Sequence, residues 1–289
     1  MIFEQAFMAL PEFLTGLPYD KFEYEGTLMT AYSMAVLQEL NGRNVNNPIS
    51  CLRSEVSYDL PSNKRSDIHL NLYDLKIMTN ELSKYGFYKE NWLEAKFFRL
   101  NSKGRATQNR TTSTFLILKD LIRLIFFPKE EIIRPEEEII RLNNIDSISG
   151  RYLLHVYEKE PAIHIASSKK NSEKGQNNGN GFIRSWLRHI MTPGKQNISL
   201  DDFHLKNEIN EFDKILHKEL RDIKLSFNVT NFIHEASKEN GTFFCCLTRI
   251  DDFSVEFSSC KYEREKSKIS VTGIDEYENM QSEIDNLLI

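Results

Sequence analysis

The sequence predicts an α+β fold, within the broad α/β class, whose first half runs helix, three strands, helix, strand. Three observations lead to this prediction: a helical apolar pattern over residues 26–42, alternating segments between residues 49 and 100, and an apolar run over residues 111–127 that stops at Pro128. With 289 residues, 40% of them hydrophobic, the chain is long enough to bury a core of this size.

The helix over residues 26–42 is indicated by apolar side chains that recur on one face. Leu28, Tyr32 and Val36 follow one another at helical spacing, and Gly42 can end the helix. This segment therefore has an apolar face to bury against the sheet that follows.

Residues 1–20 are apolar, but they do not read as a secretory signal. Glu4 and Glu12 interrupt the run and no basic segment precedes it, so we expect an N-terminal packing segment. No stretch reaches the roughly 18 uninterrupted apolar residues that a membrane helix needs. These features predict a soluble, cytoplasmic protein without a membrane partner.

Composition limits the kinds of site to expect. The net charge of -5 argues against a protein coated in basic surface, although it allows a local positive channel that faces nucleic acid. The cysteines form no CxxC pair and have no histidine at ligand spacing, so neither a zinc site nor a disulfide framework is expected; they are Cys51, Cys245, Cys246 and Cys260.

The first two strands are read from alternation with a period of two residues. Residues 49–58 alternate well enough for a strand, and residues 66–73 are the clearest such segment in the chain. In the second segment Leu70 belongs to the apolar face, whereas Asp67 and His69 lie on the polar face.

A third strand, a second helix and a fourth strand complete the predicted order. Residues 91–100 form the third strand, with Glu94 and Lys96 on the same face. Residues 111–127 form a heavily buried helix, and residues 150–160 supply the fourth strand.

The chain is expected to change module after residue 165. Residues 166–182 are polar and rich in glycine, which is typical of a flexible loop or linker. We therefore expect a core with its N-terminal packing segment over 1–165, and a C-terminal α+β extension over 183–289 for recognition or dimerisation. Within this extension the pattern predicts a helix over about 200–220, strands near 224–233, 242–249 and 253–259, and a closing helix from about 275.

The tripeptide Glu94-Ala95-Lys96 carries the chemistry of the predicted site. Residues i and i+2 of a strand point to the same side, so the carboxylate and the ammonium lie together. If the second and third strands are neighbours, Asp67 and Glu94 share a metal ion, with the carbonyl of Ala95 as a further oxygen ligand. Lys96 then orients a water molecule and stabilises negative charge that develops on a phosphate.

The pattern acid-x-Lys occurs twice more, over residues 74–76 and 222–224. Residues 74–76 have a poor strand context, and residues 222–224 follow the expected helix with no acid-bearing strand just upstream. Only Glu94 follows a strand that carries an acid on its polar face.

In these residues the chain resembles the PD-(D/E)XK nuclease superfamily, over about residues 20–160. Asp67 matches the metal-binding aspartate of the family, and Glu94 and Lys96 match its E-x-K motif. The resemblance implies a restriction-endonuclease-like αβββαβ core, with a mixed central sheet flanked by helices. It also implies Mg²⁺ as the cofactor, for which Mn²⁺ can substitute, held by Asp67, Glu94 and Ala95.

The resemblance further implies a metal-dependent phosphodiester hydrolase that acts on double-stranded DNA, such as a type II restriction enzyme or a related bacterial defence nuclease. Cutting both strands needs two active sites, so a homodimer is expected. The chain departs from the family at Ser66, which precedes Asp67 where the family often has proline.

Three further side chains are candidates for the site. The family often has a glutamate in its first helix, for which Glu25 is the better candidate and Glu55 the second; Glu25 could instead only stabilise the start of the helix through its dipole. His69 shares a face with Asp67, where it either contacts the scissile phosphate or a base, or is an ordinary satisfied histidine.

Two basic clusters are candidates for DNA contacts. Lys103, Arg105 and Arg110 lie in or beside the loop after the third strand, from which they can reach phosphates. The other cluster follows the linker and consists of Arg184, Trp186, Arg188, His189 and Lys195. Its alternative interpretation is an ordinary amphipathic helix.

Two other functions are compatible with the same sequence features. One keeps the fold without the activity, as a non-catalytic nucleic-acid or protein interaction module, and a loss of metal binding would support it. The other is a nuclease of the same fold that acts on RNA or on branched DNA, which substrate competition would separate.

Overall fold

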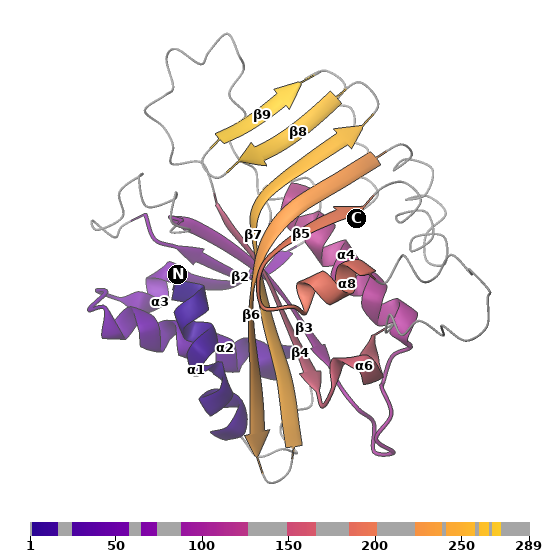
Figure 1. Cartoon of the computed structure of the whole chain (residues 1–289). Helices are drawn as coiled ribbons and strands as arrows, with labels where there is room; N and C mark the ends of the chain where they lie inside the picture. The colour runs from indigo at the N-terminus through magenta and orange to yellow at the C-terminus, as the bar shows by residue number, and fades with distance from the viewer. Residues whose placement is uncertain are drawn as a thin grey trace, which may run out of the picture.

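The computed structural model describes residues 2–16, 25–57, 65–73, 88–126, 149–165, 185–200, 223–238, 241–257, 260–265 and 268–272. Within these residues the chain forms a mixed sheet of nine strands with helices packed on both faces (Figure 1). The predicted α+β class is therefore confirmed.

The elements of the first half follow the predicted order. After α1 (Ile2–Gly16) come α2 (Glu25–Gly42), β1 (Leu52–Ser57), β2 (Arg65–Asn71), β3 (Glu90–Phe98), α4 (Arg110–Phe126) and β4 (Gly150–Glu158). A short helix, α3 (Pro48–Cys51), replaces the start of the segment predicted as the first strand, and that boundary was wrong. Proline favours the first turn of a helix, and Asn47 before it has a left-handed backbone with φ 55°, so the strand begins only at Leu52.

The strand order across the sheet is β1-β2-β3-β4-β7-β6-β5, and β8 and β9 extend it beside β7. Parallel pairing joins β3 to β4, with α4 in the connection between them, whereas the other described pairs are antiparallel. The later elements are α6 (Pro161–His164), α8 (Ser185–Ile190), β5 (Gly194–Leu200), β6 (Ile223–Lys238), β7 (Gly241–Phe257), β8 (Cys260–Glu265) and β9 (Lys268–Thr272). Because β4 pairs with β7, strands from both ends of the chain belong to one sheet.

One continuous strand, β7, stands where two strands were predicted, over 242–249 and 253–259, and that division was wrong. The acidic residue Asp251 does not interrupt the strand because its carboxylate has hydrogen-bond partners on β6 and β7. It accepts a hydrogen bond from Nε of Arg249 at 2.6 Å and another from the hydroxyl of Thr230 at 2.6 Å.

Two hydrophobic cores lie on opposite faces of the sheet (Figure 1). On one face α1 and α2 bury residues such as Phe7 against Tyr152 of β4. On the other face Leu121 of α4 and Trp186 of α8 belong to the same core as Leu153. Adjacent residues of β4 thus face different cores, as strand alternation requires, and the apolar N-terminal segment packs as a helix.

Four predictions fall wholly or largely on residues outside the described ranges: the linker over 166–182, the helix over about 200–220, the closing helix from about 275, and the DNA contact of Arg184. Of the cysteines that the structure describes in detail, Cys51, Cys245 and Cys246 are buried free thiols. Among the described helices, none has both the length and the apolar character needed to cross a membrane.

Candidate active site

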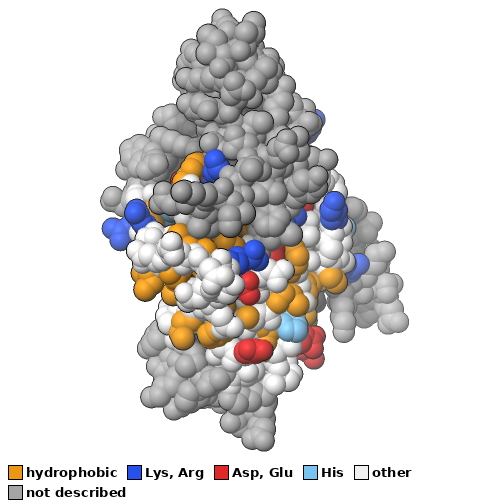
Figure 2. Space-filling view, turned by 90° about the vertical axis from the view of Figure 1, so that its left-hand side faces the viewer, with side chains coloured by type: hydrophobic (Ala, Val, Ile, Leu, Met, Phe, Trp, Pro, Cys, Tyr) orange, Lys and Arg blue, Asp and Glu red, His pale blue; other side chains and the backbone are white. Residues whose placement is uncertain are grey.

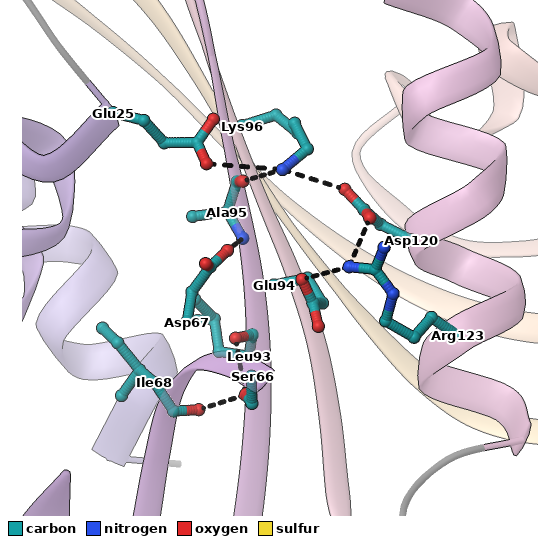
Figure 3. A network of polar contacts seen from close by, with 10 residues as sticks. All are labelled: Glu25, Ser66, Asp67, Ile68, Leu93, Glu94, Ala95, Lys96, Asp120 and Arg123. Carbon is teal, nitrogen blue, oxygen red and sulfur yellow. Dashed lines mark hydrogen bonds and ion pairs between the residues drawn. The ribbon is translucent and has the colours of Figure 1, made fainter. Parts of the chain in front are cut away.

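Strands β2 and β3 are neighbours, which places the two predicted metal-binding acids at adjacent positions of the sheet. The strands run antiparallel with Ile68 opposite Leu93, so Asp67 and Glu94 stand at the next step. Ser66 connects the strands there, since its buried hydroxyl lies 2.9 Å from the carbonyl oxygen of Ile68 and 3.0 Å from that of Leu93 (Figure 3). The long sequence gap between the two acids therefore does not keep them apart.

Asp67 is partly buried, and its carboxylate binds the backbone of β3. Its Oδ2 accepts a hydrogen bond of 2.6 Å from the amide of Ala95 (Figure 3). Burial raises the pKa of Asp67 to about 6, although the positive charge of Lys96 and the hydrogen bond from Ala95 oppose this rise. The negative charges of Glu25 and Asp120 raise the pKa further, so ionisation of this carboxylate costs more free energy here than in water.

The ammonium group of Lys96 lies at the centre of the site. Its Nζ donates a hydrogen bond of 2.9 Å to the carbonyl of Ala95, and it lies 3.4 Å from Oε1 of Glu25 and 3.3 Å from Oδ2 of Asp120 (Figure 3). Burial disfavours the charge of Lys96, but Asp120, Glu25 and Asp67 outweigh it and raise its pKa above the ordinary value. At neutral pH Lys96 is therefore a positive charge and a donor, not a base.

Glu94 faces α4 and is held there by an arginine. Its side chain is only 1% exposed, and its Oε2 lies 3.0 Å from Nη1 of Arg123. The same nitrogen lies 3.0 Å from Oδ1 of Asp120, three residues earlier on α4. Asp120 therefore joins the two cations, because its other oxygen contacts Lys96.

These contacts connect six side chains, which we call the Lys96 cluster: Glu25, Asp67, Glu94, Lys96, Asp120 and Arg123. Four of them are acids and two are bases, so the formal charge of the cluster is -2 when all are ionised. One divalent cation would bring this charge to zero. Carboxylate and carbonyl oxygens are the ligands that Mg²⁺ prefers, so the donors of the cluster fit Mg²⁺ or Mn²⁺ in charge and in kind.

The contacts of the cluster differ from those of a closed metal centre. Among the described residues, no three side chains of His, Cys, Asp or Glu gather at the spacing of metal ligands. Each predicted ligand has another partner: the carboxylate of Glu94 binds Arg123, the carbonyl of Ala95 binds Lys96, and Asp67 binds the amide of Ala95.

Asp120 and Arg123 are members of the cluster that the sequence analysis missed. They lie in the apolar run over 111–127, which was interpreted as core without a ligand. The available signal was their spacing: an acid and a base at i and i+3 share a helix face. Since such a heavily buried helix turns most of its surface inward, that pair had to meet partners on the sheet.

The two candidate glutamates are separated by the structure. Glu25, the first residue of α2, reaches the cluster through Lys96, and its side chain is 41% exposed. Glu55 is exposed on β1, where its backbone has a positive φ of 55°. The acids that act on Lys96 are Asp120, Glu25, Asp67 and Glu94, and Glu55 is not among them.

His69 lies two residues beyond Asp67 on β2 and is buried. Its ring packs on Trp92 with centroids 4.1 Å apart and 32° between the planes. Its Nε2 lies 3.6 Å from Oε1 of Glu90. Neither ring nitrogen has a hydrogen-bond partner among the described residues, so the structure does not show the satisfied histidine of the alternative interpretation, and the residue is only 6% exposed.

The first basic cluster lies on the loop after β3. Lys103 and Arg105 are exposed in a tight turn, in which Oδ1 of Asn101 accepts hydrogen bonds from both backbone amides at 3.0 and 3.1 Å. Arg110 is exposed at the start of α4, and its Nε donates to the carbonyl of Ile163 at 3.1 Å. These cations are therefore displayed on an ordered backbone.

The second basic cluster is divided between core and surface. Trp186 is 2% exposed and belongs to the core under α4, as the alternative interpretation of an amphipathic helix expects of its apolar residue. Arg188, His189 and Lys195 are exposed on α8 and β5. On the face that carries α1 and α2, the described Lys and Arg side chains are scattered and do not form a continuous patch (Figure 2).

Comparisons of the chain with protein-family models, with curated proteins and with solved structures find no match. What the chain does is therefore inferred from the Lys96 cluster and from the elements that position it.

Proposed function

We propose that this chain is a Mg²⁺-dependent nuclease of the PD-(D/E)XK kind, which hydrolyses phosphodiester bonds of DNA. The observation that carries the proposal is the position of Lys96, whose Nζ lies among the carbonyl of Ala95, Glu25 and Asp120. A lysine held protonated among several acids suits a site that binds a metal cation and an anionic substrate together.

The order of elements supports the same proposal. The run α2-β1-β2-β3-α4-β4, with the antiparallel β2–β3 pair and the parallel β3–β4 pair, agrees with a restriction-endonuclease-like core. Folds are reused for many functions, so this agreement adds weight only because the acids and the lysine lie on the strands that such an enzyme would use.

In the proposed reaction each residue of the cluster has a distinct task. Asp67, Glu94 and the carbonyl of Ala95 would hold the Mg²⁺, which when bound stabilises charge on the phosphate and lowers the pKa of a water molecule. Lys96, which stays protonated, orients the attacking water and neutralises charge that develops on the phosphate oxygens. Glu25, the 41% exposed acid, is placed to accept the proton that the water loses.

The water oxygen forms the new bond to phosphorus, the bond to the leaving oxygen breaks, and the leaving oxygen takes a proton from solvent. Cleavage of both strands of a duplex needs two such sites, so we propose that the enzyme works as a homodimer. We place it in the cytoplasm, where a defence nuclease of the type II restriction kind meets incoming DNA.

The experiment that tests the proposal is cleavage of mixed plasmid and phage DNA with Mg²⁺ and with EDTA. Wild-type protein is compared with Lys96→Ala and with Lys224→Ala. Lys224 is a matched control because it ends another acid-x-Lys tripeptide, but its side chain is 72% exposed and pairs with Glu256 only at 3.8 Å.

We expect wild type and Lys224→Ala to cleave with Mg²⁺ only, and Lys96→Ala to be slower by about 100-fold or more. Equal activity of Lys96→Ala would show that Lys96 is misassigned. RNA and branched DNA are tested in parallel. If the protein cleaves one of these and not the plasmid or phage DNA, that nucleic acid is the substrate. No cleavage of any of the three would contradict the proposal and favour an interaction module.

A further inference from the structure

Glu94, one of the proposed metal ligands, is already engaged by a cation of the protein itself. Its Oε2 lies 3.0 Å from Nη1 of Arg123, and its side chain is 1% exposed. A contact between a guanidinium and a buried carboxylate is charge-assisted and among the stronger hydrogen bonds of proteins. Any metal ion that binds Glu94 must therefore displace this contact or share the carboxylate with it.

Arg123 can release Glu94 without losing its place on α4. The guanidinium also lies 3.0 Å from Asp120, three residues earlier on the same helix, so it keeps one partner when the other leaves. The side chain of Arg123 is 13% exposed, compared with 1% for Glu94, so Arg123 is the more accessible of the two.

The charge of the Lys96 cluster favours such an exchange. With four acids and two bases the cluster has a formal charge of -2 when all six groups are ionised. Arg123 alone cannot remove this excess. A divalent cation that joins the cluster, while Arg123 remains on Asp120, brings the formal charge to zero.

We propose that Arg123 occupies Glu94 in the cation-free protein and releases it when a divalent cation binds, so that the two compete for this carboxylate. Arg123 is then a positioning residue: it keeps Glu94 neutralised and directed toward α4 until the cation arrives. The inference rests on the proposed function for the identity of the metal site, but it does not depend on cleavage.

The test is the affinity for Ca²⁺, measured by titration calorimetry without nucleic acid, for wild type, Arg123→Gln and Lys96→Gln. Both substitutions remove one positive charge beside Asp120, since the two cations lie 3.0 and 3.3 Å from its carboxylate. Of these two cations Arg123 contacts Glu94, whereas Lys96 contacts the carbonyl of Ala95, so Lys96→Gln controls for the loss of a charge and for the release of a different proposed ligand.

We expect Arg123→Gln to bind Ca²⁺ about tenfold tighter than wild type, because the cation no longer has to displace a charge-assisted hydrogen bond. Lys96→Gln should gain clearly less. Equal gains in the two variants would mean that only net charge matters and would overturn the exchange. Unchanged or weaker binding by Arg123→Gln would overturn it as well.

Removal of Arg123 takes one cation away from the buried acids Glu94 and Asp120 and can prevent folding, so Arg123→Lys provides a second measurement. This variant keeps the positive charge but replaces the guanidinium, whose Nη1 contacts both Glu94 and Asp120, by an ammonium on a shorter side chain, which holds Glu94 less firmly. We expect several-fold tighter Ca²⁺ binding than wild type, and no change would contradict the proposal. If wild-type protein cleaves DNA but neither Arg123 variant binds Ca²⁺ more tightly than wild type, this inference is refuted and the nuclease proposal stands. If none of the proteins binds Ca²⁺ or cleaves DNA, both are refuted.

Discussion

Arg249 and Arg123 each lie between two carboxylates, but the acids of their surroundings differ: the pKa of Glu4 beside Arg249 is lowered, whereas that of Asp67, in the same cluster as Arg123, is raised. Arg249 lies 2.8 Å from Glu4 of α1 and 2.6 Å from Asp251 of β7. The hydroxyl of Tyr152 donates a hydrogen bond of 3.1 Å to the same oxygen of Glu4. Burial opposes the ionisation of Glu4, but nearby positive charge, including that of Arg249, lowers its pKa below the ordinary value.

For Asp67 of the Lys96 cluster the balance is reversed. Burial and neighbouring acids raise the pKa of Asp67 to about 6, even with Lys96 close by. Charges that hold a fold together are normally stabilised by their surroundings, whereas sites kept for binding or catalysis retain groups that lower stability. The ion pair of Arg249 therefore fastens α1 to the sheet, whereas the Lys96 cluster has more acids than its own cations neutralise.

The largest expected effect on stability is that of Arg249→Leu. The substitution removes the guanidinium that lies 2.8 Å from the buried carboxylate of Glu4, and breaking a buried pair from one side costs about 3–5 kcal/mol in the free energy of unfolding. Urea denaturation measures this loss. The control Arg43→Leu removes an exposed pair with Glu39 and should change the free energy by less than about 0.5 kcal/mol. Losses of similar size in the two variants would remove the distinction between the structural pair and the surface pair.

Next in size is the effect of Asp67→Asn, which should stabilise the protein at neutral pH. Since the pKa of Asp67 is raised from 3.8 to about 6, the folded chain holds a proton in this range that the unfolded chain has released. The free energy of unfolding therefore falls as pH rises from 3.8 to about 6. Above that range Asp67 lowers the stability of the wild type by its full amount.

Asparagine cannot ionise, so the variant should exceed wild type by up to about 3 kcal/mol at pH 8, with no gain left at about pH 4. Chemical denaturation at both pH values measures the difference. The exposed acid Glu55, replaced by Gln, serves as the control and should shift stability by less than about 0.5 kcal/mol. A variant that is less stable than wild type at pH 8 would show that Asp67 supports the fold, as Glu4 does.

A smaller effect is expected for Ser66→Ala. The substitution removes a buried donor that lies 2.9 Å from the carbonyl oxygen of Ile68 and 3.0 Å from that of Leu93, with a loss of about 1 kcal/mol in the free energy of unfolding. Thermal unfolding measures it, with the exposed Ser54→Ala on β1 as the control. If Ser66→Ala leaves the free energy of unfolding unchanged but slows cleavage, Ser66 acts in the reaction and does not stabilise the fold.

Local patterns were sufficient to place Asp67 on β2 and Glu94 and Lys96 together on β3, because alternation along a strand determines which side chains share a face. The element order over the first half followed from the same kind of signal. The start of β1 was misplaced because proline and a left-handed asparagine, Asn47, act over only a few residues and convert the beginning of the segment into α3.

Asp120 and Arg123 could not be found in the same way, since their partners lie on another element. A charged pair inside an apolar helix indicates that charged partners lie on a neighbouring element. Only the three-dimensional arrangement shows that these partners are Glu94 and Lys96. The choice of Glu25 over Glu55 likewise depended on how α2 meets β3, which no periodicity in the sequence encodes.

The contacts of the Lys96 cluster also have a consequence for how this protein is made. Glu25 and Lys96 are 71 positions apart, Asp67 and Ala95 are 28 apart, and Glu94 and Arg123 are 29 apart. Contacts of such long sequence separation form only after large loops have closed, so the cluster is completed late in folding, once α2, β2, β3 and α4 have come together. An emerging or partly folded chain contains the whole Glu94-Ala95-Lys96 tripeptide without the arrangement that would make it reactive.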